Sequence, residues 1–307
     1  MEGVVYKSTG SWYSVKDADG RWWKARLKGT FKQNGLTSTN PIAVGDHVSI
    51  EPENEGEDTA TITAIHDREN HINRLSPKGR HQQHIVAANV DQSLLIATLR
   101  DPRTSTGFLD RFLVTCELYH VPAILLFNKA DLYGDKEWDL FAELEAIYSE
   151  IGYVVKLISL VEGKGVDEVQ QLLLGKTTLV SGHSGVGKSS FINAVLGTAI
   201  KTQDVSGWSG KGQHTTTFAE MYDLPAGGAI IDTPGLKEFG LVNVKKAELS
   251  GYFPEMRARL NDCQFNNCLH LNEPGCAIKE AVRNGEISEE RYVNYATILD
   301  TIDEKNY

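Results

Sequence analysis

The sequence lacks any apolar run long enough to cross a membrane, and it has few cysteines. The longest apolar run beside a candidate strand, residues 121–127, is far shorter than the roughly 20 residues of a transmembrane helix. Residues 1–13 hold no apolar stretch of the kind found in signal peptides. Four cysteines in 307 residues do not suggest a disulfide scaffold. We therefore expect a cytoplasmic protein with reduced thiols and no membrane partner, and we expect a monomer.

Composition bounds the size and class of the protein. A chain of 307 residues is long enough for two or three domains, and 41% hydrophobic and 23% charged residues are ordinary for a globular protein. The net charge of −10 argues against a general nucleic-acid binder. Basic residues nevertheless gather near the N-terminus, at Arg21, Lys24, Arg26, Lys28 and Lys32. An acidic total can therefore hide a local basic surface.

The first 70 residues have the pattern of a small β-barrel. Stretches rich in β-forming residues alternate with turn signals, at residues 4–6, 12–15, 22–27, 47–50 and 59–65. Five short strands in this length favour an OB-fold. Trp22, Trp23 and Phe31, interleaved with the basic residues, would suit stacking on RNA bases beside phosphate contacts. The alternative is that one tryptophan faces the core and the lysines are simply solvated.

Residues 74–81 contain proline and glycine without periodicity, and we interpret them as a linker. Beyond them the pattern changes to alternating strands and helices. The strand candidates are residues 93–99, 121–127, 154–158 and 177–180. One intervening helix has an apolar face made of Phe108, Leu109, Phe112, Leu113 and Cys116. This alternation predicts a doubly wound parallel sheet.

Residues 182–189 match the P-loop pattern GxxxxGK[ST] between a strand pattern and a helix pattern, which is the context that the motif requires. Glycines let backbone N–H groups surround phosphate oxygens, and the helix N-terminus adds its positive end. In this motif Lys188 reaches the β- and γ-phosphates and the Ser189 hydroxyl ligates Mg²⁺. The candidate phosphate-binding residues are Gly182, His183, Ser184, Gly185, Val186, Gly187, Lys188, Ser189 and Ser190.

A second motif, NKxD, follows the buried strand candidate at residues 121–127. It consists of Asn128, Lys129, Ala130 and Asp131. The Asp131 carboxylate can accept hydrogen bonds from the ring N–H and the amino group of guanine. Adenine offers neither donor, so a site built on such a carboxylate can discriminate by about 10⁴-fold or more. Asn128 would fix the other edge of the base, and the Lys129 stem would lie on its face.

The stretch after the P-loop contains two further motifs of GTPases. Residues 205–213 are rich in glycine and serine and lead into a threonine run at residues 215–217, which resembles switch I. One threonine would ligate Mg²⁺, and we favour Thr216. In the DxxG pattern of residues 232–235, Asp232 would hold the Mg²⁺ shell through water and the Gly235 N–H would contact the γ-phosphate. The motifs thus run NKxD, P-loop, switch I, DxxG, whereas ordinary GTPases place NKxD last.

Three cysteines and one histidine lie within a short C-terminal stretch, at Cys263, Cys268, His270 and Cys276. This is the Cys₃His composition of a closed structural zinc site. The alternative is three free thiols in a reduced protein. Residues 277–282 and 289–299 have helical patterns and are expected to cover this loop.

Together these features resemble the circularly permuted, ribosome small-subunit-dependent GTPase A family of bacteria, over essentially the whole chain. The resemblance implies an N-terminal all-β OB-fold barrel at residues 1–72 that binds RNA. It also implies a central α/β, circularly permuted P-loop GTPase fold at residues 73–240 and an α-helical zinc-binding domain at residues 241–307. Members act late in maturation of the small (30S) ribosomal subunit and hydrolyse GTP when bound to it. The implied cofactors are GTP or GDP, Mg²⁺ and one structural Zn²⁺, and the implied partners are the small subunit and its rRNA.

The resemblance also implies roles for individual site residues, and the sequence departs from the expected pattern at some of these positions. The zinc ligands would be the Cys₃His set named above. Ser159, in the base-binding loop, is followed by Leu160 where such GTPases usually have Ser-Ala. Leu236 stands where Ras-like proteins have the glutamine that orients the attacking water. His214 is the nearest candidate for that task, with Lys188 and Thr216 completing the catalytic set, unless it is only an exposed residue on a mobile loop.

These departures predict slow intrinsic turnover and leave two alternatives open. One is a GTP-gated rRNA-binding module in which hydrolysis is incidental. The other is an ATP-using kinase or ATPase, which leaves the NKxD motif unexplained. We also predict that Trp208 becomes immobilised only when a GTP analogue and the small subunit are both bound.

Overall fold

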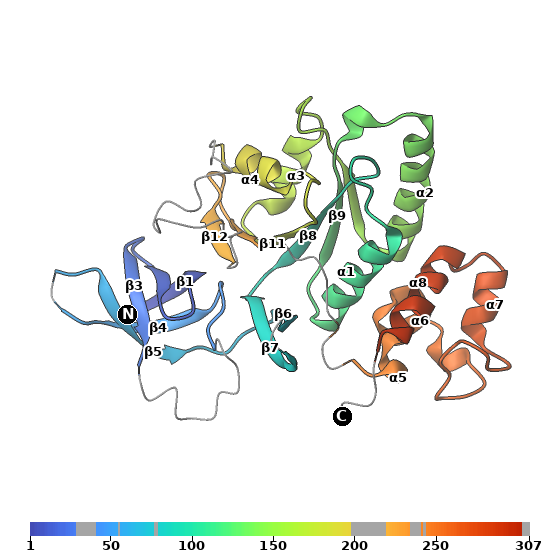
Figure 1. Ribbon diagram of the computed structural model, residues 1–307, viewed down its shortest axis with the longest axis horizontal. Helices are drawn as coiled ribbons and strands as arrows, with labels where there is room; N and C mark the ends of the chain where they lie inside the picture. The colour runs from blue at the N-terminus through green and yellow to red at the C-terminus, as the bar shows by residue number, and fades with distance from the viewer. Residues whose placement is uncertain are drawn as a thin grey trace.

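A computed structural model of the chain describes residues 1–28, 41–54, 56–76, 79–197, 219–233, 241 and 244–302, with only the backbone of residues 74–84. Within these ranges, no helix combines the length and the apolar content needed to cross a membrane. The barrel, the central sheet and the C-terminal helices follow one another along the long axis of the molecule (Figure 1).

Five short strands at the N-terminus close into the expected barrel. They are β1 (Glu2–Ser8), β2 (Tyr13–Asp17), β3 (Trp22–Leu27), β4 (His47–Pro52) and β5 (Thr59–Ile65). Their order is β1-β2-β3-β5-β4, and β1 pairs with β4 to close the ring. Alternate residues, such as Val5, Val15 and Ile62, are fully buried inside it. Buried residues alternate with partly buried ones along β2 and with exposed ones along most of β3, as expected for strands with one face in a core.

The predicted linker at residues 74–81 is wrong. This part of the chain forms a hairpin of β6 (His71–Ser76) and β7 (Gly79–Ala88), in which Ser76 pairs with Gly79. Gly79 is the first residue of β7, so a glycine in a stretch without periodicity does not indicate a linker here. Sequence patterns of this kind do not distinguish a hairpin connection from a linker when the flanking strands are polar.

The central domain is a sheet with helices on both faces. The strands, in the order β10-β9-β8-β11-β13-β12, are β8 (Gln92–Ala97), β9 (Ala123–Phe127), β10 (Val154–Leu157), β11 (Thr177–Ser181), β12 (Glu220–Asp223) and β13 (Ala229–Asp232). All neighbouring pairs are parallel except β12 with β13. The sheet is therefore the predicted doubly wound sheet with one antiparallel edge strand.

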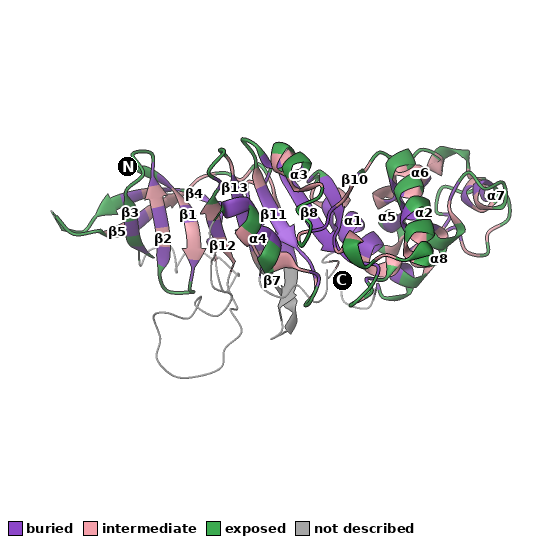
Figure 2. Ribbon diagram, turned by 90° about the horizontal axis from the view of Figure 1, so that it is seen from above, coloured by how far each residue is buried: buried purple, intermediate pink, exposed green. Residues whose placement is uncertain are grey.

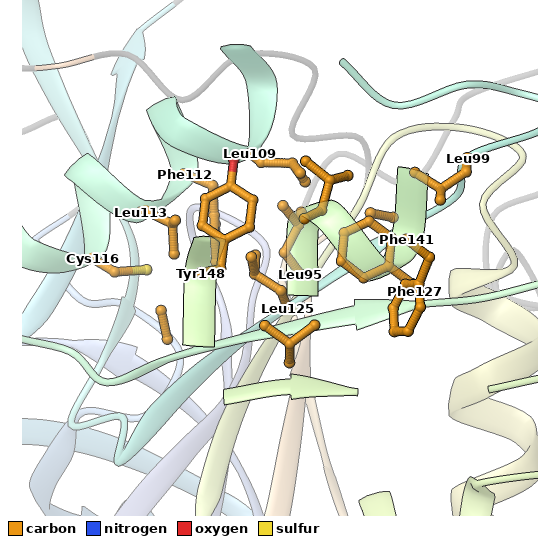
Figure 3. Close-up of a cluster of buried hydrophobic side chains, with 14 of the residues drawn as sticks. Leu95, Leu99, Leu109, Phe112, Leu113, Cys116, Leu125, Phe127, Phe141 and Tyr148 are labelled. Carbon is orange, nitrogen blue, oxygen red and sulfur yellow. The ribbon is translucent and has the colours of Figure 1, made fainter. Parts of the chain in front are cut away.

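Four helices cover this sheet. They are α1 (Thr106–Leu118), α2 (Asp135–Ile151), α3 (Val166–Leu173) and α4 (Lys188–Leu196). Residues of α1 and α2, including Phe112 and Tyr148, pack on Leu125 of β9 (Figure 3). Residues of α3 and α4, such as Val169 and Phe191, form a second core. Cys116 is buried in the first core, and burial raises the pKa of its thiol, as expected for a packing residue.

The antiparallel edge strand joins the central sheet to the barrel. Lys7 of β1 pairs with Glu220 of β12, so the barrel strands and the central strands form one continuous sheet. The Lys7 ammonium lies 3.0 Å from the Glu220 carboxylate, and Lys16 lies 2.5 Å from Asp223. Figure 2 shows this continuous sheet from above.

The C-terminal part is helical, as predicted. It contains α5 (Lys246–Leu249), α6 (Pro254–Arg257), α7 (Ala277–Arg283) and α8 (Glu289–Asp300), with 3₁₀ turns at Ser250–Tyr252 and Leu260–Asp262. Phe253, Ile278 and Tyr295 form the centre of its core, and Val114 of α1 packs against it. The C-terminal helices therefore share a core with the central domain.

A buried ion-pair network also joins these two parts. Arg291 of α8 lies 2.6 Å from Asp110 of α1 and 2.8 Å from Glu255 of α6. Tyr148 and Asn294 donate two further hydrogen bonds, each of 2.7 Å, to the Asp110 carboxylate. Burial raises the pKa of Asp110, and the Arg291 guanidinium offsets part of that rise. Each charge is thus compensated only while both helices stay in place.

We expect Arg291→Met to lower the free energy of unfolding by about 3–5 kcal/mol, because it leaves buried carboxylates without a counter-charge. Arg257 provides a matched control, since it pairs with Glu117 of the same helix α1 at 2.8 Å but is half exposed. Arg257→Met should cost less than about 1 kcal/mol. Denaturant titration of both variants measures the difference, and equal losses would contradict a special role for the buried pair.

Candidate active site and metal centre

The P-loop residues 182–189 connect β11 to α4 at the carboxyl end of the parallel strands. Gly185 and Gly187 have φ values of 89° and 94°, which side chains other than glycine rarely adopt. Ser189 and Ser190 are exposed in the first turn of α4. The loop therefore presents backbone N–H groups and two hydroxyls at a helix N-terminus, the arrangement that binds phosphate.

A buried hydrogen bond joins the NKxD motif to the P-loop. Asn128 follows β9, and its Nδ2 donates to the Val186 carbonyl at 2.9 Å. A Cβ at Gly187 would lie 2.4 Å from Asn128 Nδ2, so only glycine fits beneath this amide. Asn128 Oδ1 is buried and has no hydrogen-bond partner in the described part of the chain. A buried acceptor oxygen thus lies beside the P-loop without a partner among the described residues.

The candidate base-reading carboxylate lies in a short 3₁₀ turn, Ala130–Leu132. Asp131 is exposed, and its Oδ1 accepts a 2.6 Å hydrogen bond from Ser159 Oγ. Ser159 is fully buried, and its Oγ also accepts from the Glu162 backbone N–H. The buried Ser159 hydroxyl therefore fixes the orientation of the Asp131 carboxylate. Lys129 adopts a left-handed backbone conformation, with a φ of 67°.

The charged residues expected around phosphate and Mg²⁺ pair with each other. The Lys188 ammonium bonds to the Asp232 carboxylate at the end of β13. Val180 of β11 is paired with Asp232 in the sheet, and Thr233 Oγ1 donates to the Val180 carbonyl at 3.0 Å. The strand register thus brings the last residues of β11 and β13 to the same edge as the P-loop. The Lys188–Asp232 pair keeps both charges compensated without nucleotide.

Several predicted residues lie outside the described residues. These are His214, Thr215, Thr216 and Thr217 of the switch I candidate, Trp208 before it, and Gly235 and Leu236 after Asp232. Their roles stay predictions.

Sequence reasoning missed residues 98–105, which connect β8 to α1 and contact both nucleotide-binding motifs. Lys129 Nζ donates to the Asp101 carbonyl. Thr104 Oγ1 lies 2.7 Å from His183 Nε2 in the P-loop. No motif marks this segment. Its only sequence signal is that it follows the carboxyl end of a parallel strand, where ligands of such sheets bind.

The Cys₃His cluster is assembled in the structure. The candidate ligand atoms of Cys263, Cys268, His270 and Cys276 all lie within 4.8 Å of one another. His270 Nδ1 faces two of the thiols, at 3.6 Å from Cys263 Sγ and 3.4 Å from Cys276 Sγ. A tetrahedral zinc ion with bonds of about 2.0–2.3 Å needs ligand atoms at such separations. The residues present therefore fit a zinc ion.

The surroundings of this cluster hold its loop in place. The Glu273 carboxylate accepts 2.8 Å hydrogen bonds from the backbone N–H groups of Leu269 and Leu271. As predicted, α8 covers the loop, with Tyr292 and Tyr295 donating to the carbonyls of His270 and Leu269. Burial raises the pKa of the Cys268 thiol to about 12. Charged thiolates in this site therefore need a compensating cation.

The barrel carries aromatic and basic side chains next to each other on β2 and β3. Trp12 and Trp22 are 36% and 48% exposed, whereas Trp23 is buried and donates its Nε1–H to Asp17. Lys24 Nζ lies 4.6 Å from the Trp12 ring centroid, and Lys16 Nζ lies 5.7 Å from that of Trp22. One tryptophan is therefore a core residue and two are available at the surface. Lys32 and Phe31 lie outside the described residues.

Comparisons with known proteins match both parts of this arrangement. A family model described as RsgA N-terminal domain matches residues 2–60, and one described as RsgA GTPase matches residues 65–242. The small ribosomal subunit biogenesis GTPase RsgA of Flavobacterium psychrophilum is 51% identical over 306 residues, covering 99% of this chain and 94% of that protein. The protein of the same name from Bacteroides fragilis is 47% identical, covering 100% and 99%.

Solved structures agree with the fold. The crystal structure of YjeQ from Thermotoga maritima superimposes with a TM-score of 0.78 and 34% identity, covering 97% of each chain. That of YloQ, described as a circularly permuted GTPase, gives 0.75 and 30%, covering 97% of this chain and 93% of that one. The order of motifs along this chain, with the base-reading loop ahead of the P-loop, is therefore a property it shares with solved relatives. Since relatives align along nearly its whole length, the chain belongs to the RsgA GTPase family.

Proposed function

We propose that this protein binds and hydrolyses GTP in the maturation of the small ribosomal subunit. The observation that carries the proposal is the convergence of the NKxD loop, the Ser159 loop and the P-loop, linked by the Asn128–Val186 and Asp131–Ser159 hydrogen bonds. Relatives of about the same length carry the name small ribosomal subunit biogenesis GTPase. By the same likeness we propose a cytoplasmic monomer with domain limits at residues 72/73 and 240/241.

In this proposal the base is read by two side chains already held in place. Asp131 accepts from the ring N–H and amino group of guanine, and Ser159 keeps its carboxylate oriented. Asn128 Nδ2 has a second N–H besides the one bonded to Val186, and this N–H would donate to the acceptor atoms on the other edge of the base. Lys129 lies along the base face. An adenine base would leave the Asp131 carboxylate without donors, which disfavours ATP.

The phosphates lie against the backbone of residues 182–189. Lys188 exchanges Asp232 for phosphate oxygens, and this exchange frees the Asp232 carboxylate for the water shell of Mg²⁺. Ser189 and Thr216 supply hydroxyls to the ion, and the Gly235 N–H contacts the γ-phosphate. A Mg²⁺ ion held by these residues would neutralise the negative charge that develops on the phosphate oxygens.

Hydrolysis needs a group that orients water, and Leu236 cannot supply one. We therefore propose that the small subunit orders His214 and Thr216 against the nucleotide. A partner that completes a phosphoryl-transfer site raises turnover by about 10³–10⁵-fold.

The barrel surface around Trp12 and Trp22 is the proposed rRNA contact. Exposed indole rings offer stacking surfaces, and Lys24 next to Trp12 offers a phosphate contact. The proposal is specific to this surface, because the chain as a whole is acidic.

Turnover measured with and without purified small subunits tests the proposed activity. We expect slow hydrolysis alone and strong stimulation by the subunit. Large subunits serve as the control for non-specific ribosome effects. If small subunits bind only in the presence of GTP but stimulate nothing, the protein is instead a GTP-gated binding module.

Asp131→Asn should weaken GTP binding and shift preference toward xanthine nucleotides, because the amide offers a donor where xanthine presents an acceptor. Asp139→Asn, the same exchange on the exposed surface of α2, is the matched control and should bind GTP as the parent does. Binding of GTP, ATP and XTP is measured by competition with a fluorescent nucleotide. Unchanged GTP affinity of Asp131→Asn would remove the carboxylate from the base-binding role.

We also propose one structural zinc ion, held by the Cys₃His cluster. Purified protein should contain about one zinc per chain, and Cys268→Ala should lose the metal and the protease resistance of the C-terminal helices. Cys116→Ala is the control, since Cys116 is buried in a separate core far from this cluster in the chain. Metal-free wild-type protein with a protease-resistant C-terminus would refute the zinc site.

A further inference from the structure

The segment that connects β8 to α1, residues 98–105, contacts both loops of the proposed nucleotide site. Thr104 Oγ1 lies 2.7 Å from His183 Nε2 of the P-loop. Pro102 lies under Gly185, where an added Cβ would be 3.2 Å from its Cδ. On the other side, the Asp101 carbonyl accepts from Lys129 Nζ. One short segment thus supports the phosphate-binding loop and the base-binding loop together.

Thr104 is held tightly within this segment. Its backbone N–H donates to the Thr98 carbonyl at 2.7 Å, and its Oγ1 accepts from the Thr98 N–H at 3.0 Å. Thr104 is 4% exposed, so its hydroxyl hydrogen needs a partner within the protein. His183 Nε2 is that partner when the imidazole is neutral with its hydrogen on Nδ1. The Nδ1–H then faces the Ser184 carbonyl, at 3.2 Å.

The segment that holds Thr104 is rigid because α1, the helix that follows it, is bonded to α8. The Ser105 side chain caps α1, and Phe108 in its first turn packs edge-to-face on the His183 ring, with centroids 5.7 Å apart. Thr106 donates a 2.6 Å hydrogen bond to Glu290 of α8. Asp110, one turn further along, is held by the buried Arg291. His183 therefore contacts a helix that cannot shift without breaking buried interactions.

A P-loop binds phosphate through backbone N–H groups that point inward at the ligand. Its glycines supply conformational freedom and little rigidity, because each lacks a side chain that packs. A side-chain contact from a fixed element reduces the conformations that the empty loop samples, and this lowers the ordering cost of binding. In the P-loop, the His183 side chain makes such contacts, with Thr104 of the 98–105 segment and with Phe108 of α1.

We propose that Thr104 is a positioning residue for nucleotide binding, which holds the P-loop in its phosphate-binding conformation through His183. This inference rests on the proposed function, since it assumes that the P-loop binds a guanine nucleotide. Thr104 itself touches no phosphate in this arrangement. Its effect falls on GDP and GTP alike, because both phosphate chains use the same loop.

The test measures dissociation constants for GDP and a non-hydrolysable GTP analogue on the full chain. Thr104→Val removes the hydroxyl at nearly constant shape, and with it both the contact to His183 and the acceptor of the Thr98 N–H, and it should weaken both nucleotides by about tenfold. Thr104→Ser keeps the hydroxyl and should restore the affinity. Thr115→Val is the matched control: Thr115 is a buried threonine of α1 whose hydroxyl donates only within its own helix, to the Arg111 carbonyl.

A double-mutant cycle distinguishes positioning through His183 from a general structural effect. Thr104→Val combined with His183→Ala should bind no more weakly than His183→Ala alone, because both changes break the same contact. Additive losses would overturn the inference, as would Thr104→Val with the affinity of the parent. If Thr104→Val does not fold, His183→Ala alone decides, and parental affinity in that variant overturns the inference. If the wild-type protein binds no guanine nucleotide, the proposed function fails and the inference fails with it.

Discussion

One buried hydrogen bond, from Asn128 Nδ2 to the Val186 carbonyl, joins two motifs that are distant in the sequence and that stand in the reverse of their usual order. It can form because β9, β8 and β11 are parallel and adjacent, so their carboxyl ends meet at one edge of the sheet. Strand direction and register determine which residues meet at this edge. The order in which the chain connects the strands does not affect it. A circular permutation therefore leaves the site intact as long as each strand keeps its neighbours. The requirement for glycine at position 187, directly beneath the Asn128 amide, follows from the same contact.

The sequence predicted those parts of the molecule whose signal is local. Stretches of β-forming residues between turn signals identified the barrel strands, and apolar periodicity identified α1 and the C-terminal helices. Motif spacing placed the P-loop and the Cys₃His loop. Two features were not predictable because their signal is not local. The β6–β7 hairpin depends on pairing between polar strands, and its proline and glycine have the composition of a linker. The contact of Thr104 with His183 joins residues that are 79 positions apart and belongs to no motif.

At three places in the structure, the charge of a side chain is compensated by a neighbouring group of opposite charge and not by water. Arg291 and Asp110 neutralise each other between α1 and α8, and Lys188 and Asp232 do so beside the P-loop. Arg291 and Asp110 are both buried, so neither can exchange its partner for water or a ligand, and the pair fixes α8 on α1. In the second, both residues face a position where phosphate and a cation would replace them, so the pair can exchange partners. The Cys₃His cluster is the third case: burial raises the pKa of the Cys268 thiol, so charged thiolates there would need a compensating cation.

The permuted order also decides where the two flanking parts attach. The barrel is joined to β12, the strand that follows the switch I candidate, through the Lys7–Glu220 pairing and the Lys16–Asp223 contact. The C-terminal helices are joined to α1, which follows the segment beneath the P-loop, through Asp110 and Arg291. Each flanking part is therefore fixed to an element that begins within a few residues of the nucleotide site. A shift of β12 along its axis would break the Lys7–Glu220 pair, and a tilt of α1 would expose a buried charge. The orientations of the barrel and of the C-terminal helices therefore depend on the same strands and helices that form the candidate nucleotide site.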